Sequence, residues 1–409
     1  MKAAALVLAL TLAAAAPSAA PPSAAPPSAA LPSAAPPSAA QVPRDPATSP
    51  EQLKAAIDNL GKFDAAVRTT AARAVRRAPA AQAVPALMEA ARGHADGYVR
   101  FRALVLLSGF NDPRAREVMS TVLDDPNDRL RTVAYTYFEH NPEKGMSARL
   151  LAKLDKEEGE FVRPALTRAL AAYGDEAPVK AALTALVLRG QDLYRSAVIE
   201  ALGDYHAAYA LAPIIEVAKR DGPLQEDAVL AMGKIGDKRA LEVLQGLQKS
   251  APRARQPAVA ASICLLGINC ESHQKFVIET MTFAVANQGF QDLLRAAARA
   301  LGALAASGRQ DAAVTLLDVG IPARDPGRSP VALAFGGVAL RNTPLTIKVL
   351  LPRADLKDAA LVLRDAFDML EEDYEEERFF AIVRRSYWEA PAGSPERKLA
   401  DALIQALEF

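Results

Sequence analysis

The chain has few of the side chains that build metal sites or disulfide frameworks. Among its 409 residues the only cysteines are Cys264 and Cys270, and the four histidines are far apart in the sequence, at positions 94, 140, 206 and 273. Structural zinc sites usually draw on closely spaced pairs of such ligands. The sequence therefore predicts no metal site and no cofactor.

Aromatic residues and net charge are also scarce. Aromatic side chains make up 6% of the chain although 51% of it is hydrophobic, so Ala, Leu and Val carry the apolar content, as suits closely packed helices. Lys plus Arg and Asp plus Glu both number 48, which gives a formal net charge of zero. A nucleic-acid-binding domain usually carries a clear positive excess. We therefore expect a helical protein without a nucleic-acid partner.

No motif in the sequence indicates catalysis. We find no glycine-rich phosphate loop, no closely spaced histidine and glutamate of a metalloenzyme, and no serine or cysteine motif with a recognisable base. Scattered acids could converge in the fold, but in a chain of which 23% is charged this possibility has little weight. We predict no catalytic residues and no enzymatic activity.

The first 16 residues have the pattern of a secretory signal peptide. Lys2 is followed by an apolar run from Ala3 to Ala16 that only Thr11 interrupts. The run is shorter than the roughly 20 apolar residues of a membrane-spanning helix. We predict that residues 1–16 direct export to the periplasm or the extracellular space and that the mature protein has no transmembrane segment. An uncleaved anchor is the alternative.

Residues 17–50 form a segment of low complexity. A pentad of the form x-Pro-Ser-Ala-Ala occurs five times, and its prolines are in register at positions 17, 22, 27, 32 and 37. Proline at this frequency prevents a continuous helix, and the pentads contain almost nothing to bury. We predict a disordered linker, which is either a functional spacer or a tolerated expansion behind the signal peptide.

From residue 51 onwards an arginine recurs at a nearly constant interval. Arg68, Arg100, Arg131, Arg163 and Arg195 are separated by 32, 31, 32 and 32 residues, and an acidic residue stands three or four positions before each of them. An acid suits the beginning of a helix, where backbone N–H groups are free. A fixed period of this length in a helix-forming sequence indicates stacked helix pairs. At position 227, where the next arginine would fall, the residue is Asp227.

Each repeat unit presents apolar stripes at helical spacing. Ala240, Val243, Leu244 and Leu247 follow the i, i+3, i+4, i+7 rule, and a similar stripe begins at Tyr194. A helix hairpin cannot cover such faces by itself, so neighbouring hairpins must cover them. We therefore predict that residues 51–409 form an all-α fold, an α-solenoid of about ten antiparallel helix pairs.

The run from Gly222 to Leu247 resembles a known family. Its core, Leu-Ala-Met-Gly-Lys-Ile-Gly-Asp-Lys-Arg-Ala-Leu-Glu-Val-Leu, is similar to the short HEAT repeat of bacterial proteins, the type also found in phycobilin lyases. The resemblance extends from about Glu51 to Leu247 and more loosely to the C-terminus. It implies that the recurring acids and arginines link neighbouring repeats as a structural ladder, with a binding role as the alternative. The ladder residues are Asp64, Arg68, Asp96, Arg100, Asp128, Arg131, Arg163, Asp192 and Arg195.

Cys264 and Cys270 are candidates for a disulfide. In one continuous helix they would be roughly 9 Å apart along the axis, which is too far for a bond. If the helix ends near Gly267 and the chain reverses there, a bridge becomes possible, and an exported protein meets an oxidising compartment. Two buried free thiols are the alternative.

One acidic stretch near the C-terminus is a candidate surface for a partner. Six acids surround a tyrosine, and aromatic residues follow. Such a stretch could receive a basic partner, with the aromatics as contact area; solvated helix ends beside a buried aromatic core are the alternative. The candidate residues are Glu371, Glu372, Asp373, Tyr374, Glu375, Glu376, Glu377 and Trp388.

Taken together, these patterns predict a scaffold. We expect a non-catalytic protein-protein interaction scaffold or assembly factor of the bacterial cell envelope, which binds a protein or peptide along its curved surface. The alternative, implied by the resemblance, is a HEAT-type lyase or chaperone-like enzyme that acts on a protein-bound small molecule.

Overall fold

The computed structural model describes residues 49–409, and within this range the fold is all-α, as predicted, with 22 α-helices and no strand. The expected signal peptide and nearly all of the expected linker lie outside the described residues. None of the described helices is both long and apolar enough to cross a membrane.

The α-helices are α1 (Pro50–Asn59), α2 (Ala65–Arg77), α3 (Ala80–Gly93), α4 (Gly97–Ser108), α5 (Ala115–Val122), α6 (Asp128–His140), α7 (Met146–Leu154), α8 (Arg163–Ala171), α9 (Ala177–Leu186), α10 (Asp192–Asp204), α11 (Leu211–Ala218), α12 (Gln225–Ile235), α13 (Leu241–Ser250), α14 (Gln256–Leu265), α15 (Cys270–Ala286), α16 (Gln291–Ala306), α17 (Gln310–Gly320), α18 (Arg328–Arg341), α19 (Thr343–Leu350), α20 (Leu356–Leu370), α21 (Asp373–Glu389) and α22 (Pro395–Leu407).

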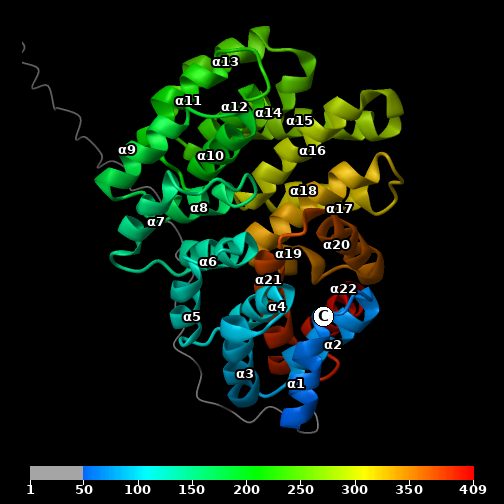
Figure 1. Cartoon of the computed structure of the whole chain (residues 1–409). Coiled ribbons are helices and arrows are strands. Elements are labelled where there is room, and N and C mark those ends of the chain that lie inside the picture. Colours follow the sequence, from blue (N-terminus) through cyan, green and yellow to red (C-terminus); the bar gives the residue numbers. More distant parts are fainter. Residues whose placement is uncertain (1–48) are drawn as a thin grey trace, which may run out of the picture. The chain divides into compact units, whose positions relative to one another are not determined.

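The helices form two layers. Even-numbered helices from α2 to α22 contact one another in sequence and make the inner layer, whereas α1, α3 and α5 begin an outer layer that continues through later odd-numbered helices. In Figure 1 the outer helices α7, α9 and α11 follow the outside of the curve, with α8, α10 and α12 within it. Each helix pair therefore covers the apolar faces of its neighbours, as the stripes in the sequence require.

The starts of the inner helices show how the sequence sets the helix boundaries. The side chain of Asp64 accepts hydrogen bonds from the backbone N–H groups that open α2, and Asp96 does the same for α4. At α6 the capping residue is Asn127 rather than Asp128, and at α10 Gln191 precedes the first helical residue, Asp192. The recurring acid is thus a helix cap in the first two repeats and a first-turn residue later.

Small residues let neighbouring inner helices approach closely. A Cβ atom added to Gly203 would lie 2.9 Å from the Cα of Ala231, and one added to Gly233 would lie 2.5 Å from the Cα of Ser262. Real Cβ atoms do not come so close to backbone atoms, so these two positions require glycine. The contacts join α10 to α12 and α12 to α14, in the middle of the inner layer.

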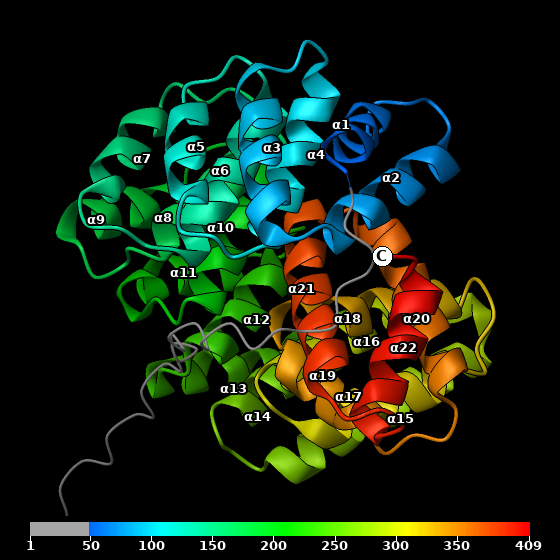
Figure 2. The ribbon, with the colours of Figure 1, turned by 90° about the horizontal axis from the view of Figure 1, so that it is seen from below.

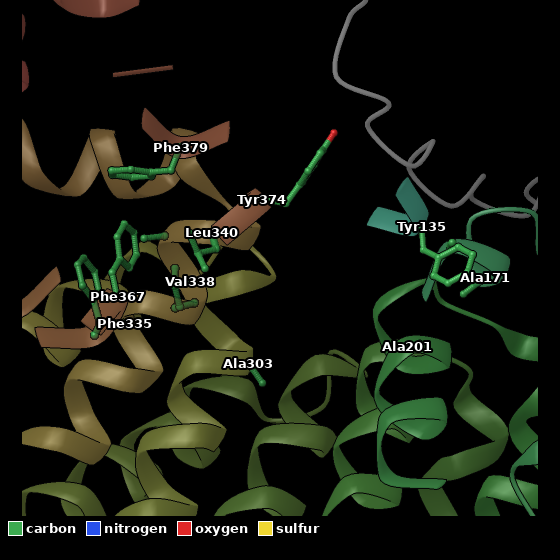
Figure 3. Close-up of a cluster of buried hydrophobic side chains, with 14 of the residues drawn as sticks. Tyr135, Ala171, Ala201, Ala303, Phe335, Val338, Leu340, Phe367, Tyr374 and Phe379 are labelled. Atoms are coloured by element: carbon green, nitrogen blue, oxygen red, sulfur yellow. The ribbon is translucent and has the colours of Figure 1, made fainter. Parts of the chain in front are cut away.

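The last helix pair returns to the first repeats, which the sequence did not predict. Helix α21 contacts α4 and α6 as well as α18 and α22, and Figure 2 shows it between α4 and the helices of the C-terminal half. Phe367 and Phe379 meet edge to face with ring centroids 5.3 Å apart. Figure 3 shows these two rings together with Phe335. Tyr374, which is on α21 like Phe379, points away from them.

Cys264 and Cys270 form a disulfide in the structure, with Cα atoms 4.0 Å apart. Helix α14 ends at Leu265, and the chain reverses through Gly267, whose φ is +80°, before α15 begins at Cys270. Glycine adopts this left-handed conformation without strain. The turn that the sequence analysis required for a bridge is therefore present.

We predict that Gly233→Ala destabilises the protein by about 1–3 kcal/mol, because the new methyl group forces α12 and α14 apart. Gly246→Ala is the matched control: Gly246 is exposed on α13, and nothing lies within 4 Å of an added Cβ. There the higher helix propensity of alanine should stabilise the protein by about 0.5–1 kcal/mol. Urea unfolding measures the stability of both variants. If Gly233→Ala were as stable as wild type, the close approach of α12 and α14 would be contradicted.

We predict that the disulfide contributes about 2 kcal/mol, because it closes a short loop in the unfolded chain. The measurement compares unfolding of the oxidised protein with that of the reduced, alkylated protein. Mass spectrometry of the unreduced protein after treatment with iodoacetamide under denaturing conditions should show no alkylation of Cys264 or Cys270. Alkylation of both thiols without a reductant would contradict the bond.

Candidate functional site: an internal charge network

The acidic start of α21 lies against the inner layer, and Glu377 is its most enclosed member. The side chain of Glu377 is 0% exposed and forms salt bridges with Arg76 of α2 at 2.7 Å and with Arg384 of α21 at 3.1 Å. Burial lowers the pKa of Arg384, Glu377 opposes this effect, and the nearby charge of Arg76 adds to it. Two buried arginines therefore share one carboxylate, which fastens α21 to the first repeat.

Glu375 makes a second connection, to α6. Its Oε1 lies 2.5 Å from Nε2 of His140, and its Oε2 accepts a hydrogen bond from Arg378 at 2.6 Å. Burial alone would raise the pKa of Glu375, but His140 and Arg378 outweigh it and lower the pKa to about 2. Glu375 is thus ionised across the physiological range. A third connection joins Asp373 to Arg102 of α4.

Asp204, at the end of α10, is a hub for the inner helices. It forms salt bridges with Lys234 of α12 at 2.6 Å, with Arg168 of α8 at 2.9 Å and with Arg341 of α18 at 3.3 Å. Burial would raise the pKa of Asp204, but the three cations lower it well below its ordinary value. Because α18 is far from α10 in sequence, this hub also ties the two halves of the inner layer together.

Glu139 continues the network on α6. The hydroxyl of Tyr205 donates a hydrogen bond to Glu139 at 2.9 Å, and Arg168 forms a salt bridge with it at 3.1 Å. Burial and the charge of Glu139 both raise the pKa of Tyr205, so its hydroxyl stays protonated and remains a donor. Arg168 therefore bridges Glu139 and Asp204, which connects α6, α8 and α10.

Glu139, His140 and Glu375 place one ligand atom each within 4.8 Å of one another, which is a spacing that a metal ion could use. The charges around them do not suit a cation. Arg168 is bonded to Glu139, and Arg378 lies 3.0 Å from Nε2 of His140 while it is bonded to Glu375. A divalent ion here would face two guanidinium groups, so the cluster fits an ion-pair network better than a metal centre.

Glu376 and Glu372 differ from their neighbours because the pKa of each is raised. Burial and the charge of Asp373 raise the pKa of Glu376 to about 8, although Arg102 opposes them, and Oε1 of Glu376 is buried without a hydrogen-bond partner. Burial also raises the pKa of Glu372, against the charge of Arg341. Glu376 is therefore mainly neutral at pH 7, whereas its neighbour Glu375 is ionised.

These contacts correct the expected role of the acidic stretch as a partner surface. Asp373, Glu375 and Glu377 are held by side chains of α4, α6 and α2, and Tyr374 is buried. The alternative, in which the acids lie beside a buried aromatic core, describes them better. It differs from the structure in one respect, because these acids pair with side chains of other helices and are not solvated. Of the other candidates, Glu371 is exposed and Trp388 is 39% exposed, with Arg397 over its ring.

The first and last ladder arginines bind the segment that precedes their own helix. Arg68 donates to the carbonyl oxygens of Lys62 and Phe63, and Arg195 donates to that of Val187 and pairs with Asp192.

In the middle repeats the ladder also links neighbours, as the resemblance implies, but the acids differ from those expected. Arg100 pairs with Asp125 at 2.5 Å, and Arg131 pairs with Glu157 at 2.7 Å, both one repeat further on. Arg163 instead lies over the ring of Tyr194, with its guanidinium carbon 3.9 Å from the ring centroid. Asp64, Asp96 and Asp128 belong to helix starts and do not complete the links.

We predict that Glu376→Gln flattens the pH dependence of stability between about pH 4.5 and pH 8. The folded pKa of Glu376, about 8, lies above the ordinary glutamate value of 4.5, so the stability that the neutral side chain contributes is complete below pH 4.5 and is lost as the pH rises through 8. From pH 5 to pH 8 the free energy of unfolding of wild type should therefore fall by at least about 1.4 kcal/mol more than that of the variant. This amount corresponds to a shift of one pKa unit.

Urea unfolding at both pH values measures this difference, and Glu371→Gln is the control, since it makes the same substitution at an exposed position of the same stretch. Parallel pH profiles for wild type and Glu376→Gln would contradict the raised pKa.

The chain is similar to several solved structures at low identity. Kap95p in its complex with RanGDP is 14% identical over 87% of this chain and 54% of that one, with a TM-score of 0.35. The complex of CpcE and CpcF of the phycocyanin lyase from Nostoc sp. PCC7120 is 19% identical over 82% of this chain and 100% of that one, with a TM-score of 0.25. Kap121p bound to Nup53p is 14% identical over 88% of this chain and 45% of that one, with a TM-score of 0.30. These similarities carry no argument about partners or activity.

Family models match two parts of the sequence. Residues 52–138 match HEAT repeats, and residues 224–250 match the PBS lyase HEAT-like repeat, which overlaps the run that resembled this family. No curated protein matches the sequence significantly. The chain therefore contains HEAT repeats in residues 52–138 and 224–250, within a stack of helix pairs.

Proposed function

We propose that this HEAT-repeat chain is an exported, non-catalytic scaffold that binds a protein partner at the bacterial cell envelope. The observation that carries the proposal is the exposure of large apolar side chains on repeats whose interiors are fully buried. Phe63 is 102% exposed, Phe161 is 85% exposed and Leu193 is 61% exposed. Several such side chains near one another are typical of an interaction surface, whereas single ones are common on any protein.

The internal charge network supports a structural interpretation of the polar residues. Asp373, Glu375 and Glu377 at the start of α21, and Asp204 at the end of α10, are bonded to arginine, lysine or histidine from other helices. A catalytic base or nucleophile must reach a substrate, whereas these groups satisfy one another. We therefore assign the network to stability and place binding on the outer surfaces and edges.

Export is supported by two independent features. The first 16 residues have the pattern of a signal peptide, although they lie outside the described residues. The bond between Cys264 and Cys270 fits an oxidising compartment, because cytosolic proteins rarely keep structural disulfides. Both features favour the periplasm or the extracellular space.

The test is purification of the full-length, C-terminally tagged chain from the cell envelope after mild crosslinking. A scaffold should retain one macromolecular partner in a fixed ratio, and Phe161→Ser should reduce that ratio at least tenfold. Phe276→Ser is the control, because Phe276 is 42% exposed on α15, away from the first repeats. A HEAT-type lyase would instead modify a protein-bound small molecule in many turnovers. That result, or a chain that stays in the cytoplasm, would contradict the proposal.

A further inference from the structure

A row of exposed side chains crosses the first five repeats where the inner helices begin. Tyr98, Arg129, Phe161 and Leu193 each stand two residues before a ladder arginine, so they occupy equivalent positions in successive repeats, and Phe63 directly precedes the cap of α2. We call Phe63, Tyr98, Arg129, Phe161 and Leu193 the edge row. Tyr98 is partly buried, and the other four are exposed.

The edge row is continuous because the beginnings of neighbouring inner helices touch one another. Inner helices α4, α6, α8 and α10 contact their neighbours in order, so their N-terminal ends lie side by side. Contacts close to the row confirm this for every step. Arg131 pairs with Glu157, and Arg163 lies over the ring of Tyr194. In the first two steps, a Cβ added to Gly61 would lie 2.5 Å from Asp96, and one added to Gly97 would lie 3.2 Å from Asn127.

Arg129 extends the aromatic character of the row instead of interrupting it. Its guanidinium carbon lies 5.8 Å from the ring centroids of both Tyr98 and Phe101, and the guanidinium carbon of Arg68 lies 6.0 Å from the Tyr98 centroid. A guanidinium that stacks on rings is held flat and can stack against another planar or apolar group. Arg129 thus adds flat surface between Tyr98 and Phe161.

The surroundings of the edge row are acidic. In the loops at 60–64, 94–96, 123–128, 155–162 and 187–192, exposed Asp and Glu residues outnumber exposed Lys and Arg residues. Asp96 is close to the row, since its side chain accepts the N–H of Tyr98 at 2.8 Å. A basic ligand is therefore favoured along this edge, and its binding should weaken as salt rises.

The repeat spacing selects an extended ligand. Neighbouring packed helices lie about 8–10 Å apart, so successive members of the row recur at about that distance. A polyproline II chain rises about 3.1 Å per residue with three residues per turn, so every third side chain falls on one line at intervals of about 9 Å. One side chain in three of such a peptide can therefore meet one repeat each.

We propose that the edge row binds an extended, basic segment of a partner protein in the polyproline II conformation, with an apolar side chain at every third position. This inference rests on the proposed scaffold function and names its surface and the chemistry of its ligand. The chain's own N-terminal segment fits poorly. Its prolines recur every five residues, and residues 3–43 contain no lysine or arginine.

The experiment measures fluorescence anisotropy of labelled synthetic peptides with the purified full-length chain at low salt. The first peptide contains four Leu-Lys-Pro triplets, the second contains four Leu-Glu-Pro triplets, and the third has the composition of the first in an order without a three-residue period. The triple variant Phe63→Ser, Phe161→Ser, Leu193→Ser removes the most exposed apolar members of the row. Phe276→Ser is the control, and circular dichroism checks that all variants keep their helix content.

We expect the Leu-Lys-Pro peptide to bind at least tenfold more tightly than the other two, and the triple variant to lose at least tenfold in affinity while the control does not change. Equal affinities for the three peptides, no binding of the first, or unchanged binding by the triple variant would overturn the inference. So would tighter binding of a peptide of residues 17–48, which would assign the row to the chain's own segment.

The envelope purification separates this inference from the proposed function. If a stoichiometric partner is retained by the triple variant, the scaffold function stands and the edge row is not its surface. If wild type retains no partner but binds the Leu-Lys-Pro peptide through the row, the peptide site stands and the envelope scaffold does not.

Discussion

The structure depends on charge pairing inside the inner layer, and above all on Glu377. Its carboxylate is shielded from solvent and bonded to Arg76 and Arg384. Removing Glu377 would leave Arg76 and Arg384 without a counter-charge in a poorly hydrated site, at a cost of about 3–5 kcal/mol, whereas an exposed ion pair contributes about 0–1 kcal/mol. A stack of repeats is ordinarily held by contacts between neighbours alone. Here a pair separated by 301 residues adds a contact between its first and last parts.

This return contact determines which surfaces are open to a partner. The acids of α21 occupy the inner faces of α2, α4 and α6, so part of the curved inner surface that a solenoid commonly offers is already covered by the chain itself. In the first five repeats the most exposed apolar side chains, Phe63, Phe161 and Leu193, lie instead at the edge where the inner helices begin. Binding at this edge would not require α21 to move, so the charge network and the edge row can act independently.

The sequence predicted the elements that are local and periodic. The arginine interval predicted the stacked helix pairs, and the apolar stripes predicted the faces that these helices bury. Gly267 indicated the turn that brings Cys264 and Cys270 together. The arginine period ends at position 227, which is Asp227, and the structure supplies a reason. Asp227 faces Arg299, with 2.5 Å between Nη1 and Oδ1, so the ladder arginine is replaced by an acid that pairs with an arginine from α16.

The charge network could not be predicted in the same way. Arg76 and Glu377, or Asp204 and Arg341, are brought together by the accumulated curvature of many repeats, and no local pattern encodes that sum. The acidic stretch was noticed because it is dense, but density alone does not distinguish a solvated patch from a set of internal partners. The edge row was hidden for a different reason. Its members share a position in the repeat but not a residue type, so only their exposure reveals them.

The central claim is that Arg76 and Glu377 couple the two ends of the repeat stack. A double-mutant cycle tests it most directly, with urea unfolding of wild type, Arg76→Met, Glu377→Gln and the double variant at pH 7. We expect Glu377→Gln to lose about 3–5 kcal/mol and Arg76→Met to lose about 1–3 kcal/mol, because Arg384 still pairs with Glu377 in the second variant. The double variant should lose less than the sum by at least about 1 kcal/mol. Additive losses, or single losses below about 1 kcal/mol, would show that α21 is not fastened to the first repeat and would contradict this account.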